Sequence, residues 1–400
     1  MNKKIQTIIP ILPLVIMAFI LGLYILDSLV GDKNGIIAGV NLEKILNYLT
    51  YINLILCVWY AFKRKIAWLQ NVLMFGLMIF LTIVLLEWIC GIVLKTQAAK
   101  APKIEGPTHS MMFDGNLGYK PKPDTSHTGV RTVDGKIVYS IKYSTDSNSL
   151  RITPIDSIKP RNKYAQFFGC SMTFGEGVQS NETLPYYFGK FDSTYRPYNF
   201  AYSGYGPHQM LARLEAGLPK KIVKEKSGVG FYIYINDHVS RVIGTMTNYG
   251  YNGGNAPYYR REANGIKRDG LFKDARRTRS WFYEKLSGSN ILKLFKIGYP
   301  FKITEENYEL TAEVMAESAR LYKQQFGNDN FYVIIYPTTA NSSLIVSLLK
   351  QKGVKVLDYS KLFDPTDKRY AIAYDEHPTA LANEILIKEL VHQFGNLKME

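Results

Sequence analysis

Cysteine is scarce in this sequence, and the scarcity limits how the fold can be stabilised. The chain has 400 residues and three cysteines. Cys57 and Cys90 fall within long apolar runs, so Cys170 stands alone in the rest of the chain. Because one cysteine cannot form an intramolecular disulfide, we exclude a disulfide framework for that part.

Histidine and acidic residues are also few. None of the six histidines has the spacing of a zinc motif such as His-Glu-x-x-His, so we predict no metal site. Asp and Glu total 34 against 49 Lys and Arg, which gives a formal charge of +15. A basic balance of this size favours an anionic partner, such as a lipid surface or an acidic glycan.

Charge is missing from three stretches near the N-terminus. Residues 7–26, 45–62 and 66–86 contain no charged side chain. Since a bilayer core needs about 20 apolar residues per helix, we predict a membrane region over 1–95. Its helices are expected at about 7–29, 45–62 and 66–94. A cleavable signal peptide is the alternative for the first run, but no small-residue cleavage site follows it.

The basic residues around these runs predict an orientation. Lys3 and Lys4 precede the first run, and residues 63–65 (Lys-Arg-Lys) lie between the second and third. Positive charge is retained on the cytoplasmic side, so we expect a multi-pass plasma-membrane protein with a cytoplasmic N-terminus. The residues after the third helix are then periplasmic or extracellular, which argues against a nucleic-acid partner.

Beyond the membrane region, the pattern predicts a linker and accessory β segment over 96–160 and an α/β domain over 161–400. Apolar strand-like runs alternate with stretches of helical periodicity. We expect strands at 164–169, 198–204, 229–236 and 330–338, and helices at 207–217, 304–326, 341–353 and 379–394. Such alternation is typical of a parallel sheet covered by helices on both faces.

One segment, residues 241–302, interrupts the alternation. It has 13 Lys and Arg against four acidic residues, with aromatic residues interleaved. Three interpretations stay open at this point. The segment lies on anionic lipid, binds an acidic glycan, or is a solvated insertion without a ligand.

The candidate site is built from residues that follow predicted strands. Ser171 follows the strand at 164–169, Gly204 ends the run at 198–204, and Asn236 ends the run at 229–236. Asp375 and His377 precede the last helix. Because parallel strands bring such positions to one edge of a sheet, these residues are candidates for one site. A serine there needs a base to become a nucleophile, and the base needs an orienting partner.

The order Ser, Gly, Asn and Asp-x-His-Pro resembles the SGNH (GDSL-type) hydrolase family over roughly residues 163–395. The resemblance implies a three-layer α/β/α sandwich with a flavodoxin-like parallel sheet. It also implies ester hydrolysis or acyl transfer without a metal or cofactor. Carried over, Ser171 is the nucleophile, His377 the base and Asp375 its partner. The amide of Ser171, with Gly204 and Asn236, forms the oxyanion hole.

Two departures from the family pattern concern the site. The block around the serine reads Gly-Cys-Ser instead of Gly-Asp-Ser, and the third block begins with Tyr234 instead of glycine. Cys170 could itself be proposed as nucleophile, but its side chain is expected to point away from that of Ser171. His238 is expected near the mouth of the site, where it either contacts substrate or caps a loop.

These observations predict a membrane-anchored serine esterase that acts on O-acyl esters of an envelope glycan or lipid. Two alternatives stay open. The same site could transfer an acyl group to an extracellular polysaccharide, or the domain could be a non-catalytic envelope scaffold that binds a glycan. The bilayer and an acylated glycan or lipid are the expected partners.

Overall fold

The computed structural model describes residues 67–155, 160–252, 254–263, 265–338 and 342–397, with short pieces between 18 and 63. Two compact units divide the chain, residues 1–89 and 90–400. The second unit contains the α/β domain, and each unit is treated by itself.

The centre of the second unit is a parallel five-stranded sheet in the order β14-β13-β10-β8-β9. Its strands are β8 (Lys163–Phe168), β9 (Tyr195–Asn199), β10 (Ser227–Tyr234), β13 (Phe331–Ile335) and β14 (Lys355–Asp358). The central strands are apolar along nearly their whole length because both faces are covered. This confirms the predicted α/β class and parallel sheet.

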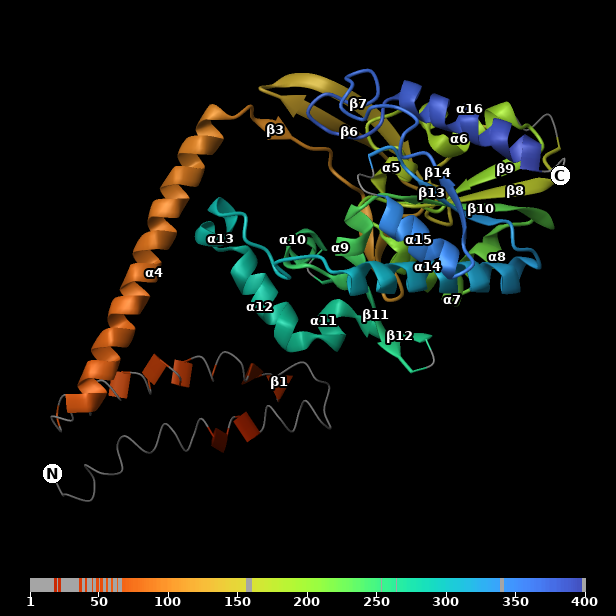
Figure 1. The fold of residues 1–400 in the computed structure, drawn as a ribbon. Coiled ribbons are helices and arrows are strands. Elements are labelled where there is room, and N and C mark those ends of the chain that lie inside the picture. The colour runs from red at the N-terminus through yellow and green to blue at the C-terminus, as the bar shows by residue number, and fades with distance from the viewer. Residues whose placement is uncertain are drawn as a thin grey trace. The chain divides into compact units, whose positions relative to one another are not determined.

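Helices cover the two faces of the sheet (Figure 1). Alternate strand residues pack in opposite layers. On one face, α7 (Pro207–Glu215), α14 (Glu305–Phe326) and α15 (Ser343–Gln351) pack on Phe168 and Tyr232. On the other, α6 (Leu184–Phe191) and α16 (Ala380–Leu397) pack on Phe167 and Phe231. The three-layer arrangement follows from this period-two alternation.

The expected strand at 198–204 is wrong in its position. β9 spans Tyr195–Asn199, and Phe200, Ala201 and Tyr202 are buried in the loop that follows. These side chains are apolar because they pack against neighbouring segments, not because they belong to the sheet. The apolar run therefore extended the predicted strand past its real end.

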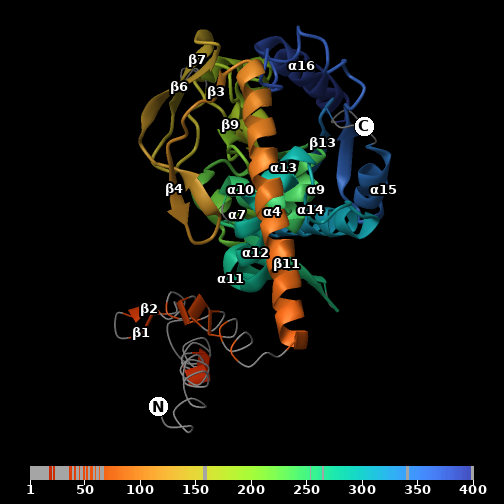
Figure 2. The same ribbon diagram turned by 90° about the vertical axis from the view of Figure 1, so that its left-hand side faces the viewer.

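The accessory segment forms two small antiparallel sheets beside the parallel one. One contains β3 (Ile104–Glu105), β6 (Ser126–Val133) and β7 (Lys136–Ser144), and the other pairs β4 (Met111–Asp114) with β5 (Gly118–Pro121). Figure 2 shows β4, β6 and β7 on the side of the domain away from α15. Tyr139 and Tyr143 pack against Phe174 and Tyr202, so this segment lies over the loops that leave β8 and β9.

The segment at 241–302 folds into short elements after α9 (Asp237–Ile243). They are α10 (Met246–Asn252), the hairpin β11 (Pro257–Glu262) and β12 (Gly265–Leu271), α11 (Phe272–Ala275), α12 (Arg277–Ser287) and α13 (Asn290–Leu294). Arg261 forms ion pairs with Glu309 and Glu313 on α14, which neutralises part of the basic charge within the fold.

A long apolar helix, α4 (Ala67–Lys100), precedes the accessory segment. Within the described ranges, Gln70–Lys100 is the one helix that is long and apolar enough to cross a bilayer, with mean hydropathy 2.6. The predicted helices at 7–29 and 45–62 fall largely outside the described residues. A three-helix membrane region therefore stays a prediction.

Candidate active site

The turn after β8 presents Ser171 at the carboxyl edge of the sheet. Gly169 has φ +153°, and a Cβ there would lie 2.2 Å from Thr173 Oγ1, so the tight turn requires glycine. Ser171 begins the short helix α5 (Ser171–Phe174), which ends at Gly175 with φ +89°. The serine residue is partly exposed.

Cys170 precedes the serine but faces the interior. Its exposed fraction is 1%, and it packs with apolar side chains of the layer that contains α6 and α16. Its thiol also interacts with Arg241 of α9, and at this burial it is not presented to a substrate. The structure therefore agrees with the expectation that Cys170 points away from the site.

Gly204 and Asn236 lie at the ends of neighbouring sheet segments. Gly204 is in the loop after β9 with φ +76°, and Asn236 follows β10 as the N-cap residue of α9. Since β10, β8 and β9 are adjacent in the sheet, the loops containing Ser171, Gly204 and Asn236 leave the same edge. Their roles as oxyanion donors stay predictions.

Asp375 and His377 form a close pair. His377 Nδ1 lies 2.6 Å from Asp375 Oδ1, and the Asp375 side chain is only 1% exposed. A tight turn holds the pair, because the Ile372 amide donates to the His377 carbonyl oxygen at 2.8 Å. This leaves Nε2 of His377 as the ring nitrogen available to act as a base.

Arg131, from the accessory strand β6, supports the same carboxylate. Its guanidinium lies 3.3 Å from Asp375 Oδ1 and donates to the Tyr374 carbonyl oxygen at 2.6 Å. Burial alone would raise the pKa of Asp375, but His377, Tyr139 and Arg131 together lower it below its usual value. The carboxylate is therefore held ionised, as an orienting partner of a base must be.

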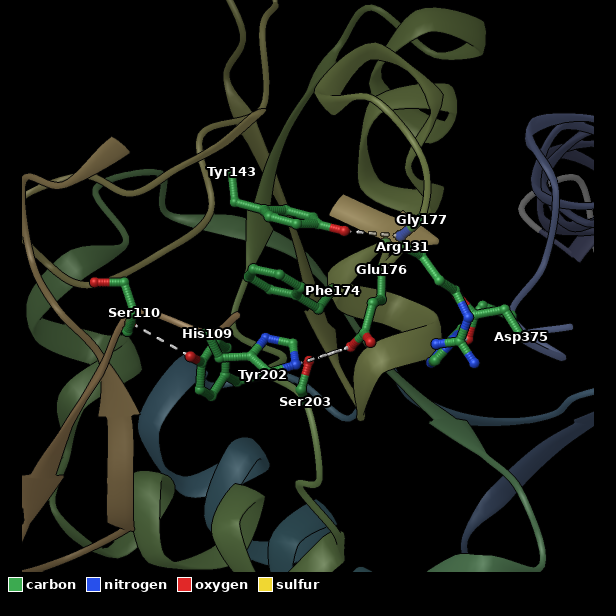
Figure 3. A network of polar contacts seen from close by, with 12 residues as sticks. His109, Ser110, Arg131, Tyr143, Phe174, Glu176, Gly177, Tyr202, Ser203 and Asp375 are labelled. Carbon is green, nitrogen blue, oxygen red and sulfur yellow. Dashed lines mark hydrogen bonds and ion pairs between the residues drawn. The ribbon is translucent and has the colours of Figure 1, made fainter. Parts of the chain in front are cut away.

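A second carboxylate, that of Glu176, lies buried in the site. Glu176 was not predicted as a site residue from the sequence. Its Oε2 accepts a hydrogen bond from Ser203 Oγ at 2.6 Å and lies 3.8 Å from His109 Nε2. Figure 3 shows the Glu176 carboxylate beside Ser203 and His109, with Arg131 and Asp375 farther along the same network. The contact with Ser203 ties the loop after Ser171 to the loop that contains Gly204.

The pKa of His377 is raised above its usual value. Burial alone would lower it, but the hydrogen bond to Asp375 and the charges of Glu176 and Asp375 outweigh burial. Because a general base must be neutral to accept a proton, activity should fall as pH drops through this raised pKa.

Glu176→Gln is expected to move the acidic limb of the kcat/KM profile to lower pH. Loss of the negative charge destabilises the imidazolium, which lowers the pKa of His377. A pH series on a small ester measures the shift. Glu105→Gln, which neutralises an exposed carboxylate on β3, serves as the matched control. An unmoved or upward-shifted limb in Glu176→Gln would contradict this role.

The structure brings the loops of Ser171 and His377 together without joining the two side chains. Asn383 at the start of α16 donates to the Glu182 carbonyl oxygen at 3.0 Å, and Ile372 lies against Gly177. Among the described residues there is no hydrogen bond between Ser171 Oγ and His377. Such bonds are often formed only when substrate is bound.

His238 does not lie at the mouth of the site, contrary to the expectation from the sequence. It is fully buried, and its Nδ1 lies 2.8 Å from the Tyr232 hydroxyl. Burial also lowers its pKa well below the usual value, so the ring is neutral. The sequence suggested proximity because His238 follows Asn236 closely, but the first turn of α9 directs the side chain inward.

Neither family models nor curated proteins match this chain. Comparison with solved structures gives a lipolytic G-D-S-L family member from Veillonella parvula (12% identity, TM-score 0.34) and one from Desulfitobacterium hafniense (13%, 0.31). The matches cover 58% of this chain and 98% and 99% of theirs.

A third similar structure is an acetyl xylan esterase from the rumen bacterium Butyrivibrio proteoclasticus. It has 9% identity and a TM-score of 0.37 over 74% of this chain and 98% of the esterase. At these identities and TM-scores, similarity does not establish a common activity.

Proposed function

We propose that the protein is a membrane-anchored serine esterase. His377 Nε2 takes the proton of Ser171 Oγ as that oxygen attacks an ester carbonyl carbon. The tetrahedral oxyanion is held by the Ser171 and Gly204 amides and the Asn236 side chain. Its collapse expels the alcohol, which receives the proton from His377, and water then hydrolyses the acyl-serine by the same route.

The observation that carries the proposal is the His377–Asp375 pair. A buried carboxylate 2.6 Å from an imidazole, itself braced by Arg131, fixes the tautomer and orientation that a general base requires. Binding of a glycan does not require a histidine whose pKa is raised by two neighbouring carboxylates at the edge of the sheet where Ser171 lies. The arrangement therefore favours catalysis over the scaffold alternative.

Burst kinetics test the esterase proposal. The full chain in lipid nanodiscs is mixed with p-nitrophenyl acetate, and p-nitrophenol release is followed from the first milliseconds. We expect an initial burst of about one product per protein before steady turnover, because the acyl-enzyme accumulates. Release no faster than from empty nanodiscs would overturn the proposal.

The membrane anchor is part of the same proposal. In α4, residues between Val72 and Val93 expose large apolar side chains such as Phe75, Phe80 and Leu85. Exposure of this kind is costly in water and expected in lipid. We infer that α4 spans the plasma membrane and that the catalytic unit lies outside the cell or in the periplasm, as Lys and Arg placement predicts.

An aromatic and basic surface on α12 and the loop after α13 supports contact with lipid. Trp281 and Phe282 are about half exposed and Phe301 is 81% exposed, beside an apolar groove of about 560 Å³. Asn290, the first residue of α13, lies next to Gly91 near the end of the apolar part of α4. We infer that this surface rests on anionic headgroups, which favours the lipid interpretation of the basic segment.

Trp281 is expected to be quenched by lipid. The sequence has four tryptophans, so Trp59, Trp68 and Trp88 are changed to phenylalanine to leave Trp281 alone. In nanodiscs containing brominated, partly anionic lipid, its fluorescence should fall relative to ordinary lipid. A variant whose only tryptophan replaces Ile137, exposed on β7, is the control. Equal fluorescence of Trp281 in both lipids would contradict the contact.

A further inference from the structure

A cavity of about 250 Å³ lies between the β4–β5 hairpin and the end of α10. Its lining includes Met111, Met112, Phe113, Tyr119, Tyr251 and Asn255. None of them was singled out by the sequence, and none takes part in the proton transfers described above.

The hairpin exposes apolar side chains that folding alone does not explain. Met111, Met112 and Phe113 are 53%, 42% and 59% exposed, although they follow one another in a four-residue strand. Three adjacent large apolar residues left in contact with water indicate a surface that is covered by something else. Methionine side chains are flexible and adapt to varied apolar shapes.

Two lining residues touch the glycine assigned to the oxyanion hole. The Tyr119 hydroxyl donates to the Ser203 carbonyl oxygen at 3.0 Å. A Cβ placed on Gly204 would lie 2.5 Å from both Tyr119 Oη and Tyr251 Cε1. Tyr119 and Tyr251 therefore link the wall of this cavity to Gly204, the residue assigned to the oxyanion hole.

The polar groups of the lining are mostly used within the protein. Asn252 Oδ1 accepts from the Gly254 amide at 3.0 Å, and Asn255 Nδ2 donates to the Asn252 carbonyl oxygen at 2.9 Å. Asn255 Oδ1 is buried without a hydrogen bond in the described part of the chain. With this acceptor and the Tyr251 hydroxyl beside three large apolar side chains, the lining suits an alkyl chain better than a sugar ring, whose several hydroxyls each need a partner.

We propose that this cavity is the acyl-chain subsite and that it holds a medium-length apolar chain while the ester carbonyl lies in the oxyanion hole. The inference rests on the proposed esterase function, because the position of the acyl chain is defined relative to Gly204 of the oxyanion hole. It assigns to the accessory hairpin a role in substrate choice, since Met111–Phe113 and Tyr119 all belong to β4 and β5.

A series of p-nitrophenyl esters from acetate to octanoate tests the subsite with the full chain in nanodiscs. Burial of each added methylene should raise kcat/KM by roughly two- to fourfold. From acetate to hexanoate, which adds four methylenes, the rise is expected to be about 16- to 250-fold, followed by a plateau when the cavity is filled. A profile that is flat or falls with chain length would overturn the proposal.

A charged variant links the preference to the cavity. Met112→Asp should lower the hexanoate-to-acetate ratio of kcat/KM about tenfold or more, because a carboxylate in the lining opposes burial of an alkyl chain. Ile137→Asp is the matched control, since Ile137 is exposed on β7 outside the cavity. Equal ratios in the two variants would contradict the assignment.

Ligand-observed NMR separates a failure of the subsite from a failure of the esterase proposal. Hexanoate, but not acetate, should receive saturation from wild-type protein, and Met112→Asp should abolish the transfer while Ile137→Asp keeps it. If no ester is hydrolysed but this pattern is seen, the subsite stands and the esterase proposal fails. If Met112→Asp and wild type give the same signal, the subsite proposal fails.

Discussion

Replacement of Ser171 or His377 by alanine is expected to lower kcat/KM for p-nitrophenyl acetate by on the order of 10⁵-fold. Without the hydroxyl there is no acyl-enzyme, and without the imidazole the hydroxyl keeps its proton. Because the two side chains act as a unit, the double variant should be no worse than either single one. Steady-state and single-turnover rates in nanodiscs measure the loss.

Matched controls separate this loss from a general disturbance of the fold. Ser180→Ala removes a hydroxyl a few residues beyond the serine turn, and His392→Ala removes an exposed imidazole on α16. Both should retain near wild-type rates. If Ser171→Ala keeps even a tenth of the activity while folded, another residue is the nucleophile.

Asp375→Asn is expected to reduce kcat on the order of 10⁴-fold with little change in structure. The amide can hydrogen-bond to the ring, but it neither fixes the same tautomer nor stabilises the imidazolium that forms during attack. Arg131 would then face a neutral amide at a distance of about 3.3 Å instead of a carboxylate.

The comparison for Asp375 is Asp364→Asn, an exposed aspartate that caps a turn in the preceding loop. That variant should retain its rate. If Asp375→Asn loses less than tenfold, the pair serves only to hold the loop together, and the assignment of His377 as an oriented base fails.

Much of the sheet could be predicted from the sequence because its strands are nearly continuous apolar runs. The run at 229–236 corresponds to β10, which is buried from Gly228 to Tyr234. The same signal misplaced β9, because Phe200 and Tyr202 are apolar for packing in a loop. An apolar run indicates that a segment is buried. A buried segment is a strand only where the chain remains in the sheet.

The candidate site could be predicted from the sequence where the interacting residues are close together in the chain. Asp375 and His377 are two residues apart, so a tight turn is enough to bring them into contact. Glu176, Arg131 and Tyr119 were missed because they reach the site through tertiary packing. Arg131 is separated from Tyr374 by 243 positions, and no local pattern indicates such a contact.

His238 shows the opposite error. Its position two residues after Asn236 suggested that both side chains share the site, but the first turn of α9 places the ring against Tyr232 in the interior. Successive residues of a helix point in directions about 100° apart, so proximity in sequence does not give a shared face.

The most direct test of the account is mass spectrometry of the full chain after treatment with a fluorophosphonate. Such a reagent phosphonylates an activated serine and mimics the tetrahedral intermediate of acyl transfer. The account predicts one adduct per protein, located on the peptide that contains Ser171 and lost in His377→Ala. An unlabelled, folded protein, or an adduct on a different residue, would contradict it.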